Sequence, residues 1–458
     1  MSTMNTAKKD NMDLTQGSIL NKLLVVAVPI MGTQLMQMLY NLTDMFWLGR
    51  IGSDAVAAVG TAGMFLWLSQ AFLMIGRMGS EIGVSQSIGR KDEDSARKYS
   101  QTSLALSVIL GIVFGVVLIV LRHPLIGFFR LPDQAVAADA ALYLAITGAA
   151  VPATYITGAL TGTFNASGNS RTPFFINAAG LAANMILDPL MIHTFGWGVT
   201  GAAIATGLAQ VLVAVIFLIA MKKGKGRPFS EYRFLIRIKK ERVKQILWWS
   251  IPVVLESMLF TILSMLISRI VAGMGVTAMA VQRVGSQIES LSWLIGGGFS
   301  SAVTAFMGQN YGAGKWSRVH RGIDISMKAM AAWGVVITFI LFFAGRFIFS
   351  LFLPDPVAVD MGEIFLKALA LCQVVACLEY TSAGVLRGIG KTIPPSIVSI
   401  SGNVIRVPIV YALSMTSLGI NGVWLGISLG SIIRSVWLFI WFLVIAKKLP
   451  KEDALLES

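Results

Sequence analysis

The sequence has 458 residues, of which 55% are hydrophobic and only 13% are charged, and its mean hydropathy is +0.73. A soluble chain carries roughly 25% charged residues because its surface faces water, so this composition excludes an ordinary soluble protein. The net charge of +14 does not indicate nucleic acid, because the Lys and Arg residues gather in the tails and in alternate loops. This positive-inside pattern predicts a multi-pass protein of a bacterial-type inner membrane, with a lipid bilayer around it and both termini cytoplasmic.

Twelve apolar stretches are long enough to cross a hydrocarbon core of about 30 Å, which takes about 20 helical residues. The first six lie at 18–48, 55–80, 100–121, 136–160, 172–192 and 199–221, and the last six at 245–272, 279–305, 325–352, 361–385, 393–415 and 421–446. The first run is too long for the core of a signal peptide, so we expect it to be a spanning helix.

A basic stretch at 222–244 separates the two sets of helices and is expected to be a cytoplasmic linker. The predicted domains are therefore an N-terminal lobe at 1–221 and a C-terminal lobe at 245–458, which includes the C-terminal tail.

The two lobes repeat one another. A shift along the chain aligns Pro29 with Pro252, and a slightly shorter one aligns Asn184 with Asn403. Because six helices are an even number, both lobes start on the same side and are related by an axis along the membrane normal. The predicted fold is thus an all-α polytopic membrane protein of two pseudo-twofold six-helix bundles (6+6), with a cleft between them suited to alternating access.

Acidic residues inside spanning helices are unfavourable in lipid and are candidates for function. Asp44 and Asp188 lie about four residues, or roughly 6 Å, from the outer ends of the first and fifth helices, and therefore at one depth. Asn184 lies one turn from Asp188 on the same helix face. Tyr143 and Thr206, on the fourth and sixth helices, fall near the level of Asn184.

Two carboxylates, an amide and two hydroxyls at similar depth predict a proton relay or a small cation site lined by oxygens. Two neighbouring carboxylates in a medium of low dielectric would share a proton. The alternative is structural, with Asp44 capping a turn and Asp188 stabilising the break at Pro189. The repeat favours function, since Ile267 and Val407 stand at the positions of the two acids in the second lobe.

Glu256, Arg283 and Glu289 form a second group on the seventh and eighth helices. They are expected to be either a charge-balanced network that holds the C-terminal lobe or a site for a substrate cation or the coupling ion. Glu81 lies near the cytoplasmic end of its helix, where solvation or snorkelling would suffice. Glu379 is a weaker candidate near another cytoplasmic end.

Pro29 lies inside the first helix, where proline frees a carbonyl and bends the helix, so it is a candidate hinge for moving Asp44, although a static kink is equally consistent. Methionine and aromatic residues on the first, second, seventh and eighth helices are candidates for an adaptable apolar substrate cleft, or else simple packing residues. They are Met31, Met36, Met38, Met64, Trp67, Met258, Met265 and Trp293.

Nothing in the sequence predicts an enzyme, a metal site or a cofactor. The only cysteines, Cys372 and Cys377, fall on one apolar helix and are expected to pack there, and the three histidines lack the spacing of metal ligands. The stretch GIGKT at 388–392 lacks the first glycine of a phosphate loop. Without a nucleotide site, any transport must draw on an ion gradient.

Four stretches together carry a family resemblance: VPIMGTQLMQMLYNLTDMFWLGRIGSDAVAAVG (28–60), FNASGNSRTPFFINAAGLAANMILDPLMI (164–192), MGQNYGAGK (307–315) and GVLRGIGKT (384–392). The chain resembles the multidrug and toxic compound extrusion (MATE) family over essentially its whole length. The resemblance implies a secondary active exporter of small organic compounds, often cationic or amphipathic, in exchange for protons or, alternatively, sodium. We expect it to act as a monomer.

The acids of the first and fifth helices are most similar to those of the DinF branch, in which the N-terminal lobe carries the cation site. Asp44, Asn184, Asp188 and Thr206 match positions of that site. Ala376 stands where the NorM branch carries an acid, so the resemblance does not extend to that branch's C-terminal cation site. The alternative function is a flippase of lipid-linked saccharides or lipids from the same superfamily, which would require several arginines in the cleft.

Overall fold

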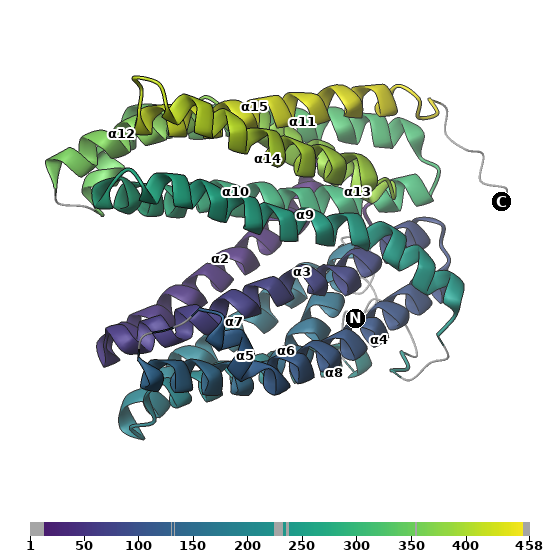
Figure 1. Ribbon diagram of the computed structural model, residues 1–458. Coiled ribbons are helices and arrows are strands. Elements are labelled where there is room, and N and C mark those ends of the chain that lie inside the picture. The colour runs from purple at the N-terminus through teal and green to yellow at the C-terminus, as the bar shows by residue number, and fades with distance from the viewer. Residues whose placement is uncertain are drawn as a thin grey trace. The chain divides into compact units, whose positions relative to one another are not determined.

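The computed structural model describes residues 13–129, 131, 133–223, 232–234, 238–352 and 355–451. Within these ranges every regular element is helical, which confirms the predicted all-α class (Figure 1). The first-half helices are α2 (Ile19–Ile51), α3 (Ser53–Gly89), α4 (Glu93–Val120), α5 (Arg122–Gly127), α6 (Gln134–Ala166), α7 (Arg171–Pro189), the π-helix η1 (Leu190–Thr194) and α8 (Gly198–Lys223). The second-half helices are α9 (Lys240–Ala272), α10 (Val276–Gly312), α11 (Trp316–Ser350), α12 (Pro356–Ala370), α13 (Gln373–Gly388), α14 (Ile393–Ser414) and α15 (Ile420–Ala446).

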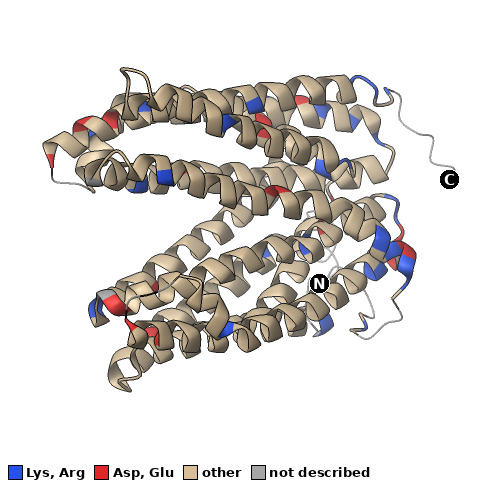
Figure 2. Ribbon diagram, viewed as in Figure 1, with Lys and Arg blue, Asp and Glu red and all other residues tan. Residues whose placement is uncertain are grey.

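Eleven spans within the described ranges are long and apolar enough to cross a membrane, and the bent pair α12–α13 makes a twelfth. This agrees with the twelve predicted spans, and long charge-free stretches run along the helices (Figure 2). Several helices extend past their predicted ends: α3 reaches Gly89 and α10 reaches Gly312. Hydropathy marks only the part of a helix that lies in lipid, whereas the backbone ladder continues into the polar flanks.

The tenth span, predicted as one helix at 361–385, is instead two helices with a 48° bend between them. Side chains take up carbonyls that the break removes from the helix ladder. Ser428 donates to the carbonyl of Ala368 at 2.7 Å, and the amide of Gln373 donates to that of Leu369 at 3.3 Å. Cys372 lies at this break, so it does not share an unbroken helix with Cys377, although both thiols are buried as expected. A break satisfied by side chains leaves no trace in hydropathy.

The described chain divides into two compact units. Unit 1 contains residues 13–14 and 25–254, and unit 2 contains residues 15–24 and the chain from 255 onward. The first division, between residues 14 and 15, precedes α2, and the other two fall inside α2 and α9. Much of the expected linker at 222–244 lies outside the described residues.

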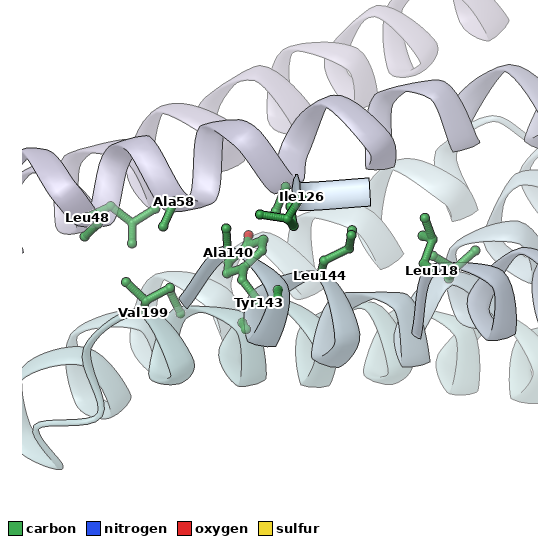
Figure 3. Close-up of a cluster of buried hydrophobic side chains, with 14 of the residues drawn as sticks. Leu48, Ala58, Leu118, Ile126, Ala140, Tyr143, Leu144 and Val199 are labelled. Carbon is green, nitrogen blue, oxygen red and sulfur yellow. The ribbon is translucent and has the colours of Figure 1, made fainter. Parts of the chain in front are cut away.

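Unit 1 is built around α6, which packs against α3, α4 and α8. Small residues allow the closest approach: a Cβ added at Gly115 would lie 2.7 Å from the carbonyl oxygen of Gly148 on α6. At one end of the unit, α2, α3, α4, α5, α6 and α8 contribute to a hydrophobic cluster that includes Leu48, Ala140 and Tyr143 (Figure 3). This cluster fixes the backbone around the predicted acidic site.

Unit 2 has its own hydrophobic cluster, in which Phe349, Phe365 and Trp424 are almost fully buried. Ile267 belongs to this cluster and Val407 packs against it. These two residues occupy the repeat positions of Asp44 and Asp188. The second unit therefore packs hydrocarbon at the places where the first carries its acids.

Candidate functional site

The acids of unit 1 are positioned by an irregular turn at the end of α7. Asp188 and Pro189 end this helix, and the chain continues as the π-helix η1. A π-turn of this kind often marks a functional position. Helix α8 lies directly on η1, because a Cβ added at Gly201 would be only 2.6 Å from the carbonyl oxygen of Met191. This close approach brings Thr206 of α8 towards the acids.

Four of the five predicted site residues are buried in unit 1, and the fifth, Asp44, is partly buried. Asn184 donates a hydrogen bond from Nδ2 to Oδ1 of Asp188 at 2.9 Å. Asp44 of α2 lies within electrostatic range of Asp188, and Tyr143 of α6 interacts with both acids and with Thr206. The structure therefore brings together residues from α2, α6, α7 and α8, as the helix-depth argument predicted.

Tyr40 is a further member that the sequence argument missed. It lies one helical turn before Asp44 on the same face of α2 and interacts with Thr206 and both acids. The four-residue spacing from Asp44 was the available signal. Depth along the helix did not reveal it, because a tyrosine side chain extends well beyond the level of its own Cα.

Five oxygens in this group are buried and have no hydrogen-bond partner within the described protein. They are Tyr40 Oη, Asp44 Oδ1, Asn184 Oδ1, Asp188 Oδ2 and Thr206 Oγ1. An unsatisfied buried polar atom costs about 1–3 kcal/mol, so such a concentration is unfavourable for an acidic cluster whose only task is structural. Protons on the carboxylates, or a small cation among the oxygens, would satisfy these atoms.

The donor set is made of oxygens alone, from carboxylates, an amide and hydroxyls. Hard cations prefer such ligands, whereas zinc prefers histidine and cysteine. In the described residues no three His, Cys, Asp or Glu side chains are grouped as they would be around a metal ion. The arrangement suits a proton or a small hard cation.

The internal repeat also appears in comparison with known proteins. A family model described as MatE matches residues 29–190 and 252–412, which is well over half of the chain. The chain belongs to the MatE family. The two matched segments begin at Pro29 and Pro252, the residues that the internal repeat aligns. The MATE resemblance seen in the sequence motifs is thereby confirmed.

This MatE-family chain is 28% identical to "Probable multidrug resistance protein NorM" of Thermotoga maritima, over 93% of its own length and 92% of that protein's. It is 27% identical to "Probable multidrug resistance protein YpnP" of Bacillus subtilis, over 94% of its own length and 96% of that protein's. The solved structure "Crystal structure of MATE in the bent conformation" superposes with a TM-score of 0.86 and covers 95% of this chain and 97% of that one. At 23% identity this match shows the fold alone.

The second predicted group of this MatE-family chain is not assembled as expected. Glu256 pairs with Arg387 at 3.3 Å and accepts a hydrogen bond from Ser396 at 2.9 Å. Arg283 is exposed and forms no ion pair with Glu256 or Glu289 within the described chain. The physical reason is helical phase: six residues correspond to about 240° around a helix, so Arg283 and Glu289 lie on different faces of α10.

The two acids that were expected near cytoplasmic helix ends also have specific partners. Glu81 is only 1% exposed and pairs with Arg77 at 3.1 Å, so the expectation that solvation or snorkelling would suffice for it was wrong. Glu379 pairs with Arg434 at 2.8 Å and accepts a hydrogen bond from Ser435 at 2.6 Å. Hydropathy places an acid near a helix end but does not show whether an arginine on the same or a neighbouring helix covers it.

None of the eight predicted cleft residues is buried. Met64, Trp67, Met265 and Trp293 are exposed, and Met31, Met36, Met38 and Met258 are partly buried. Lining of a cleft by these residues stays a prediction.

Pro29 lies within an unbroken α2, so the hinge also stays a prediction. The carbonyl of Val25, one turn before Pro29, accepts a hydrogen bond from Ser170 at the start of α7 at 3.4 Å.

Proposed function

We propose that this chain is a secondary active exporter that exchanges small organic compounds, often cationic or amphipathic, for protons by alternating access. Relatives that match more than nine-tenths of the chain are named as probable multidrug resistance proteins. The observation that carries the coupling proposal is the group of five partnerless buried oxygens around Asp44 and Asp188. Such a group changes its interactions strongly when a proton arrives or leaves.

The proposed cycle assigns the proton to the Asp44–Asp188 pair. Protonation removes the repulsion between the carboxylates and gives a donor to the neighbouring oxygens, so it favours a different arrangement of α2 and α7 from the ionised state. The hydrophobic surroundings of Ile267 and Val407 support an asymmetric mechanism in which unit 1 alone couples. One proton that crosses the membrane down a potential of about 100 mV supplies roughly 2.3 kcal/mol. This free energy can sustain a substrate concentration ratio of about fifty-fold across the membrane.

Sodium is the alternative coupling ion, since the same oxygens are suitable ligands for it. Carboxylate, amide and hydroxyl oxygens bind hard cations as well as protons. We place the protein in an inner membrane with both termini in the cytoplasm, on the strength of its positive-inside loops. That it acts as a monomer is part of the proposal and follows the resemblance to the MATE family.

The deciding experiment measures transport of a fluorescent organic cation in sealed vesicles that contain the purified chain. A proton gradient and a sodium gradient are imposed separately, each with an ionophore that collapses it. Transport that follows the proton gradient alone supports the proposal. Transport that follows the sodium gradient alone replaces the proton by sodium, and transport that ignores both gradients refutes secondary active export.

A paired comparison tests which unit couples. Asp188→Asn should abolish gradient-driven transport, whereas Glu256→Gln should leave the dependence on the gradient intact, because Glu256 already has Arg387 and Ser396 as partners. Exposed Asp324, whose ion pair with Lys328 lies on the surface, provides the matched control variant Asp324→Asn. If Glu256→Gln uncouples transport while Asp188→Asn stays coupled, the assignment to unit 1 is wrong.

A further inference from the structure

Unit 2 contains two arginines that are seated on glycines of each other's helix. The stem of Arg406 on α14 covers Gly430 of α15, where an added Cβ would lie 2.5 Å from Cγ of the arginine. Likewise the stem of Arg434 on α15 covers Gly402 of α14, where the corresponding distance is 2.6 Å. Gly430 precedes Arg434 by four residues on α15, and Gly402 precedes Arg406 by four residues on α14, so each arginine packs on a glycine one helical turn from the other arginine. This reciprocal packing provides room for two guanidinium groups inside the bundle.

The two guanidinium groups differ in what they bind. Arg434 pairs with Glu379 at 2.8 Å and donates to the amide oxygen of Asn403 at 3.1 Å. Arg406 is only 7% exposed, and Nε has no hydrogen-bond partner. Among the described residues no carboxylate oxygen lies within 4.0 Å of its nitrogens. Arg406 is therefore a buried cation without a protein counterion in contact.

Groups around Arg406 are suited to an organic ligand. Its guanidinium lies 6.0 Å from the ring centre of Phe260 on α9, and that ring meets Trp293 of α10 edge-on at 5.6 Å. Glu289 of α10 faces both Arg406 and Arg434 electrostatically and interacts with the indole N–H of Trp293, but it makes no ion pair with either arginine within the described chain. A carboxylate and a guanidinium, neither of them in an ion pair within the described chain, thus lie near two aromatic rings.

Building the bundle does not require these arginines. Extending the repeat alignments of the two lobes places Leu187 at the position of Arg406 and Val213 at the position of Arg434. The equivalent helices of unit 1 carry apolar side chains at these two positions, and Val213 is buried in a hydrophobic cluster. Burying an unpaired guanidinium is unfavourable, so its retention in unit 2 indicates a partner that is outside the protein.

We propose that Arg406 binds the carboxylate of an organic zwitterion, whose apolar ring packs on Phe260 and Trp293 and whose cationic group faces Glu289. A planar guanidinium recognises a carboxylate through two parallel hydrogen bonds, and it does so most strongly where water is excluded. That the ligand is an exported compound rests on the proposed transport function. The binding itself does not.

The test uses the full-length protein, purified and without an ion gradient, and two fluorescent rhodamines. One carries a free carboxylate beside its cationic ring system, and the other is the methyl ester of the same dye. Fluorescence anisotropy measures the binding of each. Arg406→Met should weaken binding of the free acid by about tenfold to a hundredfold, the effect of losing charged hydrogen bonds, and change binding of the ester less than about twofold.

Two further variants separate recognition from folding. Arg406→Lys keeps the positive charge but loses the planar, forked guanidinium, so it should still weaken binding of the free acid more than binding of the ester. Arg283→Met removes an exposed arginine from the same unit and should leave both dyes unaffected. Thermal unfolding of Arg406→Met should match the wild type or occur at higher temperature, because the variant removes a buried charge that has no counterion in contact.

Three results for Arg406→Met would overturn the proposed site: an equal loss of binding for both dyes, unchanged binding of the free acid, or a large fall in the unfolding temperature. A different result would refute the exporter proposal. We expect Asp188→Asn to bind both dyes as the wild type does and yet to lose gradient-driven transport, so a variant that binds the dyes and still transports them normally would contradict the transport mechanism and leave the binding site intact.

Discussion

Replacing Gly201 by alanine tests whether the contact between α8 and η1 positions the acidic site. The new Cβ would lie 2.6 Å from the carbonyl oxygen of Met191 and 3.1 Å from the backbone nitrogen of Ile192. Both atoms belong to the main chain of η1, so no side-chain rotation relieves the overlap. The two helices must separate, and Thr206 moves with α8.

The size of the displacement follows from the distances. Ordinary contact begins near 3.4 Å, so the Cβ and the oxygen must move apart by about 0.8 Å. Overpacking of this kind costs about 1–3 kcal/mol of folding stability. A displacement near 1 Å in a preorganised site can reduce a rate by about a hundredfold. We therefore expect Gly201→Ala to lower gradient-driven transport at least tenfold and to lower the unfolding temperature by several degrees.

Transport in vesicles and thermal unfolding of the purified protein measure the two effects. Gly207→Ala is the matched control on the same helix, because its Cβ would meet only the Cβ of Ala150, at an ordinary 3.6 Å. That variant should transport and unfold like the wild type. If Gly201→Ala behaves like Gly207→Ala in both assays, close packing of α8 on η1 does not position the site.

Three further predictions use the same two assays. Asp44→Asn and Asp188→Asn should each abolish gradient-driven transport while leaving the unfolding temperature unchanged or higher, and normal transport by either variant would exclude an essential role. Tyr40→Phe removes a buried hydroxyl that has no hydrogen-bond partner within the described protein, so stability should hold while transport slows about tenfold, and unaltered transport would remove Tyr40 from the site. Glu81→Gln takes the counterion from Arg77 and should reduce the free energy of unfolding by about 1–3 kcal/mol, whereas an unchanged melting curve would show the pair to be energetically neutral.

Much of the architecture was accessible from the sequence, because lipid imposes its demands locally. Every span had to be a helix of sufficient apolar length, since backbone groups in lipid must be satisfied within the segment. Equal rise per residue then set Asp44 and Asp188 at one depth, and the helical period put Asn184 beside Asp188. The structure places these three residues in one group.

Lateral partners were not accessible in the same way. The sequence grouped Glu256 with Arg283 and Glu289, yet Glu256 pairs with Arg387 on α13. It also gave no sign that Arg406 is buried without a counterion. A position along and around one helix is a local property, but the neighbour that meets it depends on how the helices pack.

The membrane environment, the twelve spans, the repeat and the level of the acids along their helices all follow from the amino-acid sequence. Three features became visible in the folded protein alone: Tyr40 joins the site, the tenth span bends, and α8 lies close enough to η1 to place Thr206 near the acids. These features depend on contacts between residues far apart in the chain, such as Ser428 with the carbonyl of Ala368. Such contacts arise from the fit of side chains between helices, and neither hydropathy nor helical period encodes that fit.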